Sequence, residues 1–165
     1  MSLMSKPAEQ NSTPKRRAGA TGPLPSAARL RAGLVTTLIG LFVFTVGARP
    51  DWFAWDRSPV VGFVQLSVFL IGLGLICVGG AIGLLAVWNG LGRTIMADIG
   101  LRLVSTGYVI SVFAGMADVF GMGSQPLPGV PYFGPWQATG VLIGEVLIAI
   151  GFLMLIPYRS VFTSV

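Results

Sequence analysis

Four blocks of apolar residues, separated by polar and turn-forming segments, dominate the pattern of the chain. They cover approximately residues 32–48, 60–88, 101–120 and 136–157. A helix of roughly 20 residues crosses about 30 Å of hydrocarbon, so each block is close to the length of a membrane span. The pattern predicts an all-α membrane protein, a four-transmembrane-helix bundle within residues 29–165.

The segment before the first block has a different composition. Residues 1–28 are rich in Pro, Ser, Gly, Ala and basic residues, and they contain no aromatic residue. Such a segment has too little apolar surface to offset its conformational entropy. We expect a disordered, basic, cytoplasmic tail.

Composition and charge agree with a membrane location. Hydrophobic residues make up 53% of the chain and charged residues 10%, whereas soluble domains carry about a quarter charged residues. The net charge of +5 raises the question of nucleic-acid binding. The basic residues, however, lie in the tail and at the borders of the apolar blocks, where they act as topology signals. We therefore expect the lipid bilayer, and no nucleic acid, as a partner.

The distribution of Lys and Arg predicts the orientation. Six basic residues precede the first block or border its start, Arg93 and Arg102 flank the middle connection, and Arg159 follows the last block. The first connection is bordered by Arg49 and contains Arg57. The positive-inside rule then places both termini in the cytoplasm. We expect a multi-pass protein of the plasma membrane, specifically of a bacterial inner membrane.

Two of the spans leave alternatives open. The first block is short, and Val46 and Ala48 have the small side chains of a signal-peptide cleavage site. Cleavage after Ala48 would leave three spans and an external N-terminus. The second block is longer than a span needs, so we expect it to tilt or to emerge into the interface at Trp88.

Glycine recurs at intervals of seven or four residues within the blocks. Seven residues make nearly two helical turns, so each helix presents a narrow smooth face that allows close packing in lipid. These faces form seams inside one chain or, alternatively, an interface with a second copy or a partner. The residues are Gly33, Gly40 and Gly47; Gly72, Gly79 and Gly83; Gly100, Gly107, Ser111 and Gly115; and Gly140, Gly144 and Gly151.

The second and fourth blocks suggest the hypothesis of an internal duplication. An offset of 80 residues aligns residues 64–76 with residues 144–156 and places Gln65 opposite Glu145. Apolar helices resemble one another by composition alone, so the alignment by itself establishes no repeat.

Glu145 is the strongest candidate for a functional residue. It lies near the middle of the fourth span, where an ionised carboxylate costs at least a few kcal/mol, so we expect the side chain to be neutral. Tyr108, Ser111 and Gln65 are its candidate polar neighbours. Three roles are open: a hydrogen-bonded link between helices, a proton relay or cation-coupling site, and contact with a cation of a partner subunit.

The predicted external connections carry aromatic and charged residues. Trp and Tyr at the ends of spans usually anchor a helix at the membrane interface, and the alternative is a binding surface. Asp118 is expected to be solvated or paired with Arg57 or Arg49, and Asp98 to pair with Arg102. The candidate external surface consists of Trp52, Trp55, Asp56, Arg57, Tyr132 and Trp136.

The chain lacks residues that metal sites, many cofactor sites and most catalytic sites require. The chain has no histidine, and its one cysteine, Cys77, lies in an apolar block, so we expect no metal site and no cofactor. No phosphate-binding glycine motif is present. We expect a non-catalytic membrane protein, a small scaffold or accessory subunit, with a homo-oligomer or a membrane protein as partner. The alternative is a small transporter or proton-coupled permease that uses Glu145.

Overall fold

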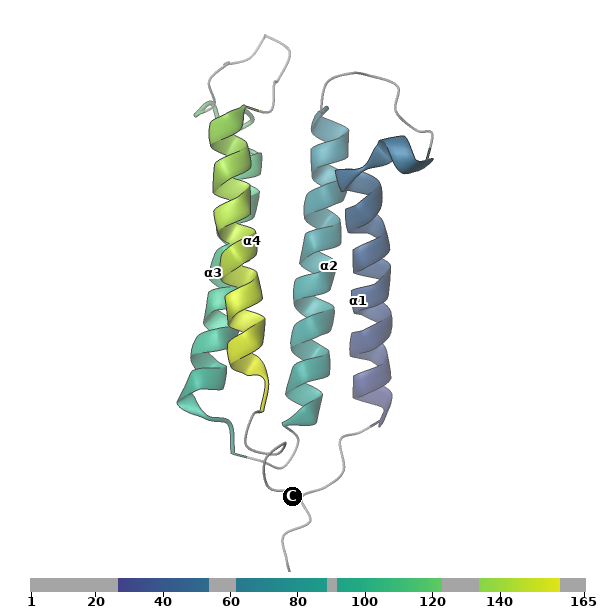
Figure 1. The fold of residues 1–165 in the computed structure, drawn as a ribbon, viewed down its shortest axis with the longest axis vertical. Coiled ribbons are helices and arrows are strands. Elements are labelled where there is room, and N and C mark those ends of the chain that lie inside the picture. Colours follow the sequence, from purple (N-terminus) through teal and green to yellow (C-terminus); the bar gives the residue numbers. More distant parts are fainter. Residues whose placement is uncertain (1–26, 54–61, 89–91, 123–133, 158–165) are drawn as a thin grey trace, which may run out of the picture.

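The structure, a computed structural model, describes residues 27–53, 62–88, 92–122 and 134–157. In these residues it contains four long α-helices, one short 3-10 helix and no strand. The predicted all-α architecture is confirmed. The elements, in chain order, are α1 (Ala27–Ala48), η1 (Pro50–Phe53), α2 (Phe63–Val87), α3 (Ile95–Gly115) and α4 (Pro135–Leu155) (Figure 1).

All four α-helices are long and apolar enough to cross a membrane. In the most apolar 18-residue stretch of each helix, only 17% to 28% of the residues are buried inside the bundle. Most of the apolar side chains therefore point outward, as they do in a protein whose solvent is lipid. The chain is an integral membrane protein with several spans.

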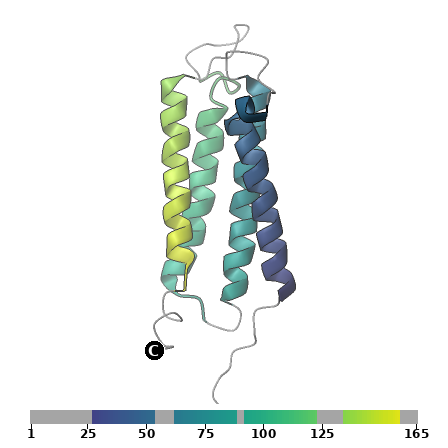
Figure 2. The same ribbon diagram turned by 45° about the vertical axis from the view of Figure 1, so that its right-hand side comes forward.

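The helices form two antiparallel hairpins. In the first hairpin α1 packs along α2, and in the second α3 packs along α4. Contacts between the hairpins are sparse and run mainly from α2 to α3 and α4; both views show the two pairs (Figures 1 and 2). We call the end with η1 and the starts of α2 and α4 the η1 end, and the opposite end the Trp88 end.

Glycine creates the contact between the helices of the first hairpin. Gly33, Gly40 and Gly47 are the buried residues of α1. A Cβ atom on Gly40 would lie 2.7 Å from the backbone nitrogen of Ile76, and one on Gly79 would lie 2.5 Å from that of Thr37. The two backbones therefore approach too closely for any larger residue.

The second hairpin is built in the same way. A Cβ atom on Gly107 would lie 2.5 Å from the carbonyl oxygen of Gly144, and one on Gly151 would lie 2.7 Å from that of Gly100. The glycine faces of the four helices thus pack mainly within the hairpins, whereas Gly115 meets Leu66 and Leu70 of α2 as well as Val141 of α4. They form seams inside the chain.

Equivalent glycine contacts align the second hairpin with the first, and the resulting alignment differs from the one suggested by the sequence. Gly40 meets Ile76 in the first hairpin as Gly107 meets Ile148 in the second, so α3 corresponds to α1 67 residues further on, and α4 to α2 72 residues further on. This register differs from the offset of 80 residues that the sequence alignment used. It makes Gln137, rather than Glu145, the counterpart of Gln65.

An apolar layer joins the hairpins in the middle of the bundle. Buried Leu73 and Cys77 of α2 meet Val104 and Ile148 of the second hairpin. Three partly buried aromatic side chains pack against this layer from α1, α3 and α4. They are Phe44, Tyr108 and Phe152.

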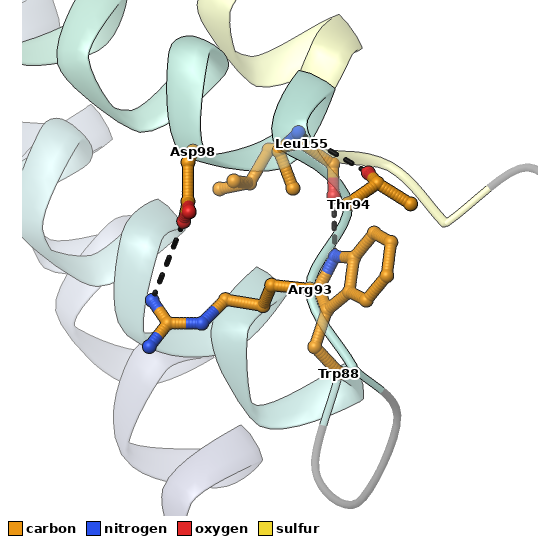
Figure 3. Close-up of polar contacts among 6 residues, drawn as sticks. Trp88, Arg93, Thr94, Asp98 and Leu155 are labelled. Atoms are coloured by element: carbon orange, nitrogen blue, oxygen red, sulfur yellow. Dashed lines mark hydrogen bonds and ion pairs between the residues drawn. The ribbon is translucent and has the colours of Figure 1, made fainter.

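A second contact closes the Trp88 end. Trp88 is only 8% exposed and packs with Ala97 and Leu155. Its indole Nε1 donates a hydrogen bond of 2.8 Å to the carbonyl oxygen of Leu155 (Figure 3). The indole thereby satisfies the free carbonyl at the end of α4, while the tilt of the second block and its emergence into the membrane interface at Trp88 stay predictions.

Two helices begin earlier than their apolar blocks. α1 starts at Ala27, five residues before the predicted span. α3 starts at Ile95, six residues before it, because the Oγ1 of Thr94 caps the helix by accepting a hydrogen bond from the Ala97 backbone nitrogen. The tail before residue 27 lies outside the described residues, as do residues 54–61 and 123–133 of the two connections that were predicted to be external.

The first turns of α3 also correct a predicted ion pair. The carboxylate of Asp98 lies 3.8 Å from the guanidinium of Arg93 (Figure 3), whereas the sequence spacing suggested Arg102. Both side chains are more than half exposed, so the pair contributes little stability.

Candidate functional site

The strongest candidate site is a partly open pocket between the hairpins, of about 530 Å³. Three helices line it near the η1 end, and we call it the interhairpin pocket. Its residues follow helical spacing, so that each helix contributes one face. They are Phe44, Gly47 and Ala48 of α1; Gln65, Leu66 and Phe69 of α2; and Ala138, Val141, Leu142 and Glu145 of α4.

Gln65 and Glu145 are the polar side chains of this pocket. Gln65 lies in the first turn of α2, and Glu145 lies ten residues after the start of α4, about 15 Å along the helix. Both are half-buried. Within the part of the chain that the structure describes, neither side chain has a hydrogen bond or an ion pair. The structure therefore brings the two predicted residues to one pocket without linking them to each other.

Tyr108 and Ser111, the other two predicted members of the polar site, do not line this pocket. The Ser111 hydroxyl is fully buried, donates a 3.0 Å hydrogen bond to the carbonyl oxygen of Gly107, and lies 3.4 Å from that of Val141. The Tyr108 hydroxyl lies 3.4 Å from the carbonyl oxygen of Leu70. Both hydroxyls join helices by bonding to backbone.

The interhairpin pocket ends on the apolar middle layer. Phe44 belongs both to the pocket wall and to the group of side chains packed on Leu73, Cys77, Val104 and Ile148. Beyond this layer the contact of Trp88 with α4 closes the other end. In the described bundle, the polar side chains of the pocket thus have no polar continuation toward the Trp88 end.

Two residues of the predicted external surface are highly exposed at the η1 end. Trp52 is 71% and Trp136 is 87% exposed. Trp136 also lines a second open pocket of about 590 Å³ at the junction of α3 and α4, together with Phe113, Ala114, Ala117, Met122, Gly134 and Gln137. Trp55, Asp56, Arg57 and Tyr132 lie outside the described residues.

The environment of Asp118 differs from the predicted one. It is only 6% exposed, and among the described residues its Oδ1 has no hydrogen-bond partner. Arg49, one of its two predicted partners, lies 3.9 Å from Asp51 instead. A signal for this burial was available, because Asp118 follows Gly107, Ser111 and Gly115 along the buried face of α3.

Gln137 is a second buried polar residue that the sequence analysis missed. It is 7% exposed, and its Oε1 accepts a 2.8 Å hydrogen bond from the backbone nitrogen of Gly134. This bond caps the N-terminus of α4, so the role of the side chain is structural.

Nothing in the described residues resembles a metal centre, since no three His, Cys, Asp or Glu side chains gather there. Comparison with known proteins does not assign the chain to a family. Neither protein-family models nor curated proteins nor solved structures match the chain.

Proposed function

We propose that the chain is a non-catalytic membrane protein, a small scaffold or accessory subunit that acts by contact with another membrane protein. One observation carries this proposal: in the described bundle, buried apolar side chains of both hairpins, Leu73, Cys77, Val104 and Ile148, pack together between the polar pocket and the Trp88 end. A solute path needs several polar groups that converge through the bilayer. Here Tyr108 and Ser111 are engaged with backbone.

The contact surface in this proposal is the η1 end. The glycine seams are used inside the hairpins, so a partner must bind elsewhere. Exposed aromatic side chains are preferred anchors in protein interfaces, and Trp136 projects beside an open pocket with Phe113 and Met122. Trp136 is therefore the residue where we expect contact.

Photo-crosslinking tests this function. A photoreactive residue in place of Trp136, activated in native membranes, should give one discrete protein adduct. The control is the same residue at Leu153, which is 56% exposed near the other end of α4; it should give lipid adducts. Lipid adducts at both positions, together with purification of the chain alone in mild detergent, would contradict the proposal.

A permease is the second candidate, and the shared pocket of Gln65 and Glu145 favours it. The two functions differ in a measurable way. A permease moves protons or solute across reconstituted vesicles and loses that flux when Glu145 is replaced by Gln. The scaffold shows no flux in either form.

We further propose that the η1 end is external and both termini are cytoplasmic, in the plasma membrane. Among the described residues, basic side chains gather toward the Trp88 end, where Arg29, Arg31, Arg93 and Arg102 lie, whereas Arg49 lies at the η1 end. Basic residues are enriched on the cytoplasmic side of membrane proteins.

Cysteine labelling measures this orientation. In a Cys77→Ala background, a membrane-impermeant maleimide added to intact cells should label Asp51→Cys and leave Arg93→Cys unlabelled until the cells are permeabilised. The two native side chains are similarly exposed, at 52% and 53%, so accessibility alone does not separate them. The reverse labelling pattern would refute the orientation.

A further inference from the structure

We propose that the interhairpin pocket is a binding site for a membrane-soluble organic cation, such as a lipophilic amine or a quaternary ammonium compound. The inference is independent of the partner contact at Trp136. It depends on the size of the pocket, on its aromatic wall and on its two polar side chains, which have no hydrogen bond or ion pair within the described residues.

Size favours a small molecule over a protein helix. On α4 the lining residues run from Ala138 to Glu145, which is about 10 Å along the helix. A transmembrane helix that packs along the bundle has a span of about 30 Å to cover. The volume of about 530 Å³ lies within the range of small-molecule sites, about 300–1,000 Å³.

The pocket is also accessible from the bilayer. Its lining helices are membrane spans, and Leu142 on its rim is 59% exposed. A ligand that dissolves in lipid can therefore enter sideways, without crossing the apolar middle layer.

Charge complementarity selects a cation. Glu145 is the one titratable group in the wall of the pocket, and neither a basic side chain nor a hydrogen-bond donor satisfies it within the described residues. An isolated carboxylate in hydrocarbon is costly and holds a proton. An organic cation supplies the missing opposite charge and lets the proton leave, and the free amide of Gln65 offers a further polar contact.

The aromatic wall fits the same ligand. Phe44 and Phe69 both line the pocket and pack against each other with ring centroids 4.6 Å apart. The face of an aromatic ring attracts a cation within about 6 Å of its centroid, most strongly where water is excluded. A carboxyl group next to two phenyl rings therefore matches a cation that carries apolar substituents.

Equilibrium dialysis of the purified full-length chain in detergent tests the proposal with tetraphenylphosphonium as the probe. We expect saturable binding that weakens at least tenfold in Glu145→Gln, since the charge partner is lost while the shape is kept. Tetraphenylborate has nearly the same shape and the opposite charge, so it should show no saturable binding. Empty micelles give the background partitioning of both ions.

A matched pair of variants separates the pocket from a general loss of structure. Leu142→Trp fills the pocket and should abolish binding, whereas Ile143→Trp adds the same ring at a neighbouring exposed position that does not line the pocket and should leave binding unchanged. Helix content and gel-filtration profile confirm that each variant is folded.

Three outcomes would overturn the proposal. The first is no saturable binding to the unaltered chain. The second is equal binding by Glu145→Gln, and the third is equal binding of tetraphenylborate, which would indicate a pocket for neutral lipid. Protein adducts at Trp136 are unaffected by any of these results, so the partner contact and the ligand site can fail separately.

Discussion

Replacing Gly79 by alanine should destabilise the first hairpin by about 2–3 kcal/mol, the upper part of the range for an overpacked site. The added Cβ would lie 2.5 Å from the backbone nitrogen of Thr37 and 2.9 Å from the carbonyl oxygen of Gly33. Backbone atoms cannot rotate away as a side chain can, so α1 and α2 must separate, and dispersion contact between them is lost along the seam.

Labelling of the buried Cys77 thiol with increasing amounts of SDS measures this loss, because the thiol reacts only when the bundle opens. Gly83→Ala is the matched control. It lies four residues further along α2, and its Cβ would meet only Gly33, at 3.9 Å, which is ordinary contact. Equal labelling of the two variants would show that the seam tolerates a methyl group and that the close approach is not required.

Trp88→Ala should weaken the junction between the hairpins by about 3 kcal/mol. That is the lower end of the range for Trp→Ala in soluble cores, because in a bilayer the reference solvent is lipid rather than water. The substitution removes the packing on Ala97 and Leu155, and it leaves the Leu155 carbonyl oxygen without its donor.

Trp88→Phe separates the two contributions. It keeps most of the ring volume and removes only the 2.8 Å hydrogen bond, which is worth about 1 kcal/mol. Cross-linking between cysteines placed on α2 and α4 reports whether the hairpins remain docked. If Trp88→Ala opens the bundle no more than Trp88→Phe does, the indole contributes its hydrogen bond alone.

The apolar blocks were sufficient to predict four spans, because span length is set by the thickness of the bilayer. The glycine spacing correctly predicted close helix packing. Which helices pair was not evident, since every helix carries a glycine face. Local features set the ends of α3 away from the ends of its apolar block. Thr94 starts the helix ahead of the block, and Gly121, with a φ of 72°, occupies the left-handed conformation in the turn that follows the helix.

The candidate polar site was predicted in part. Gln65 and Glu145, two of its four predicted members, share a pocket. Tyr108 and Ser111 have similar depth but face other helices, and depth along a helix carries no information about direction around it. The burial of Asp118 was missed because its position near a helix end suggested solvent.

The two-hairpin arrangement has a consequence for biogenesis. Each glycine seam joins helices that are neighbours in the chain, so its contacts are local and form quickly. The first hairpin has its complete packing surface once residue 87 has left the ribosome, before any of the second hairpin is needed. The bundle can thus assemble from two preformed units, and its pocket comes into being only at the last step, when the units dock.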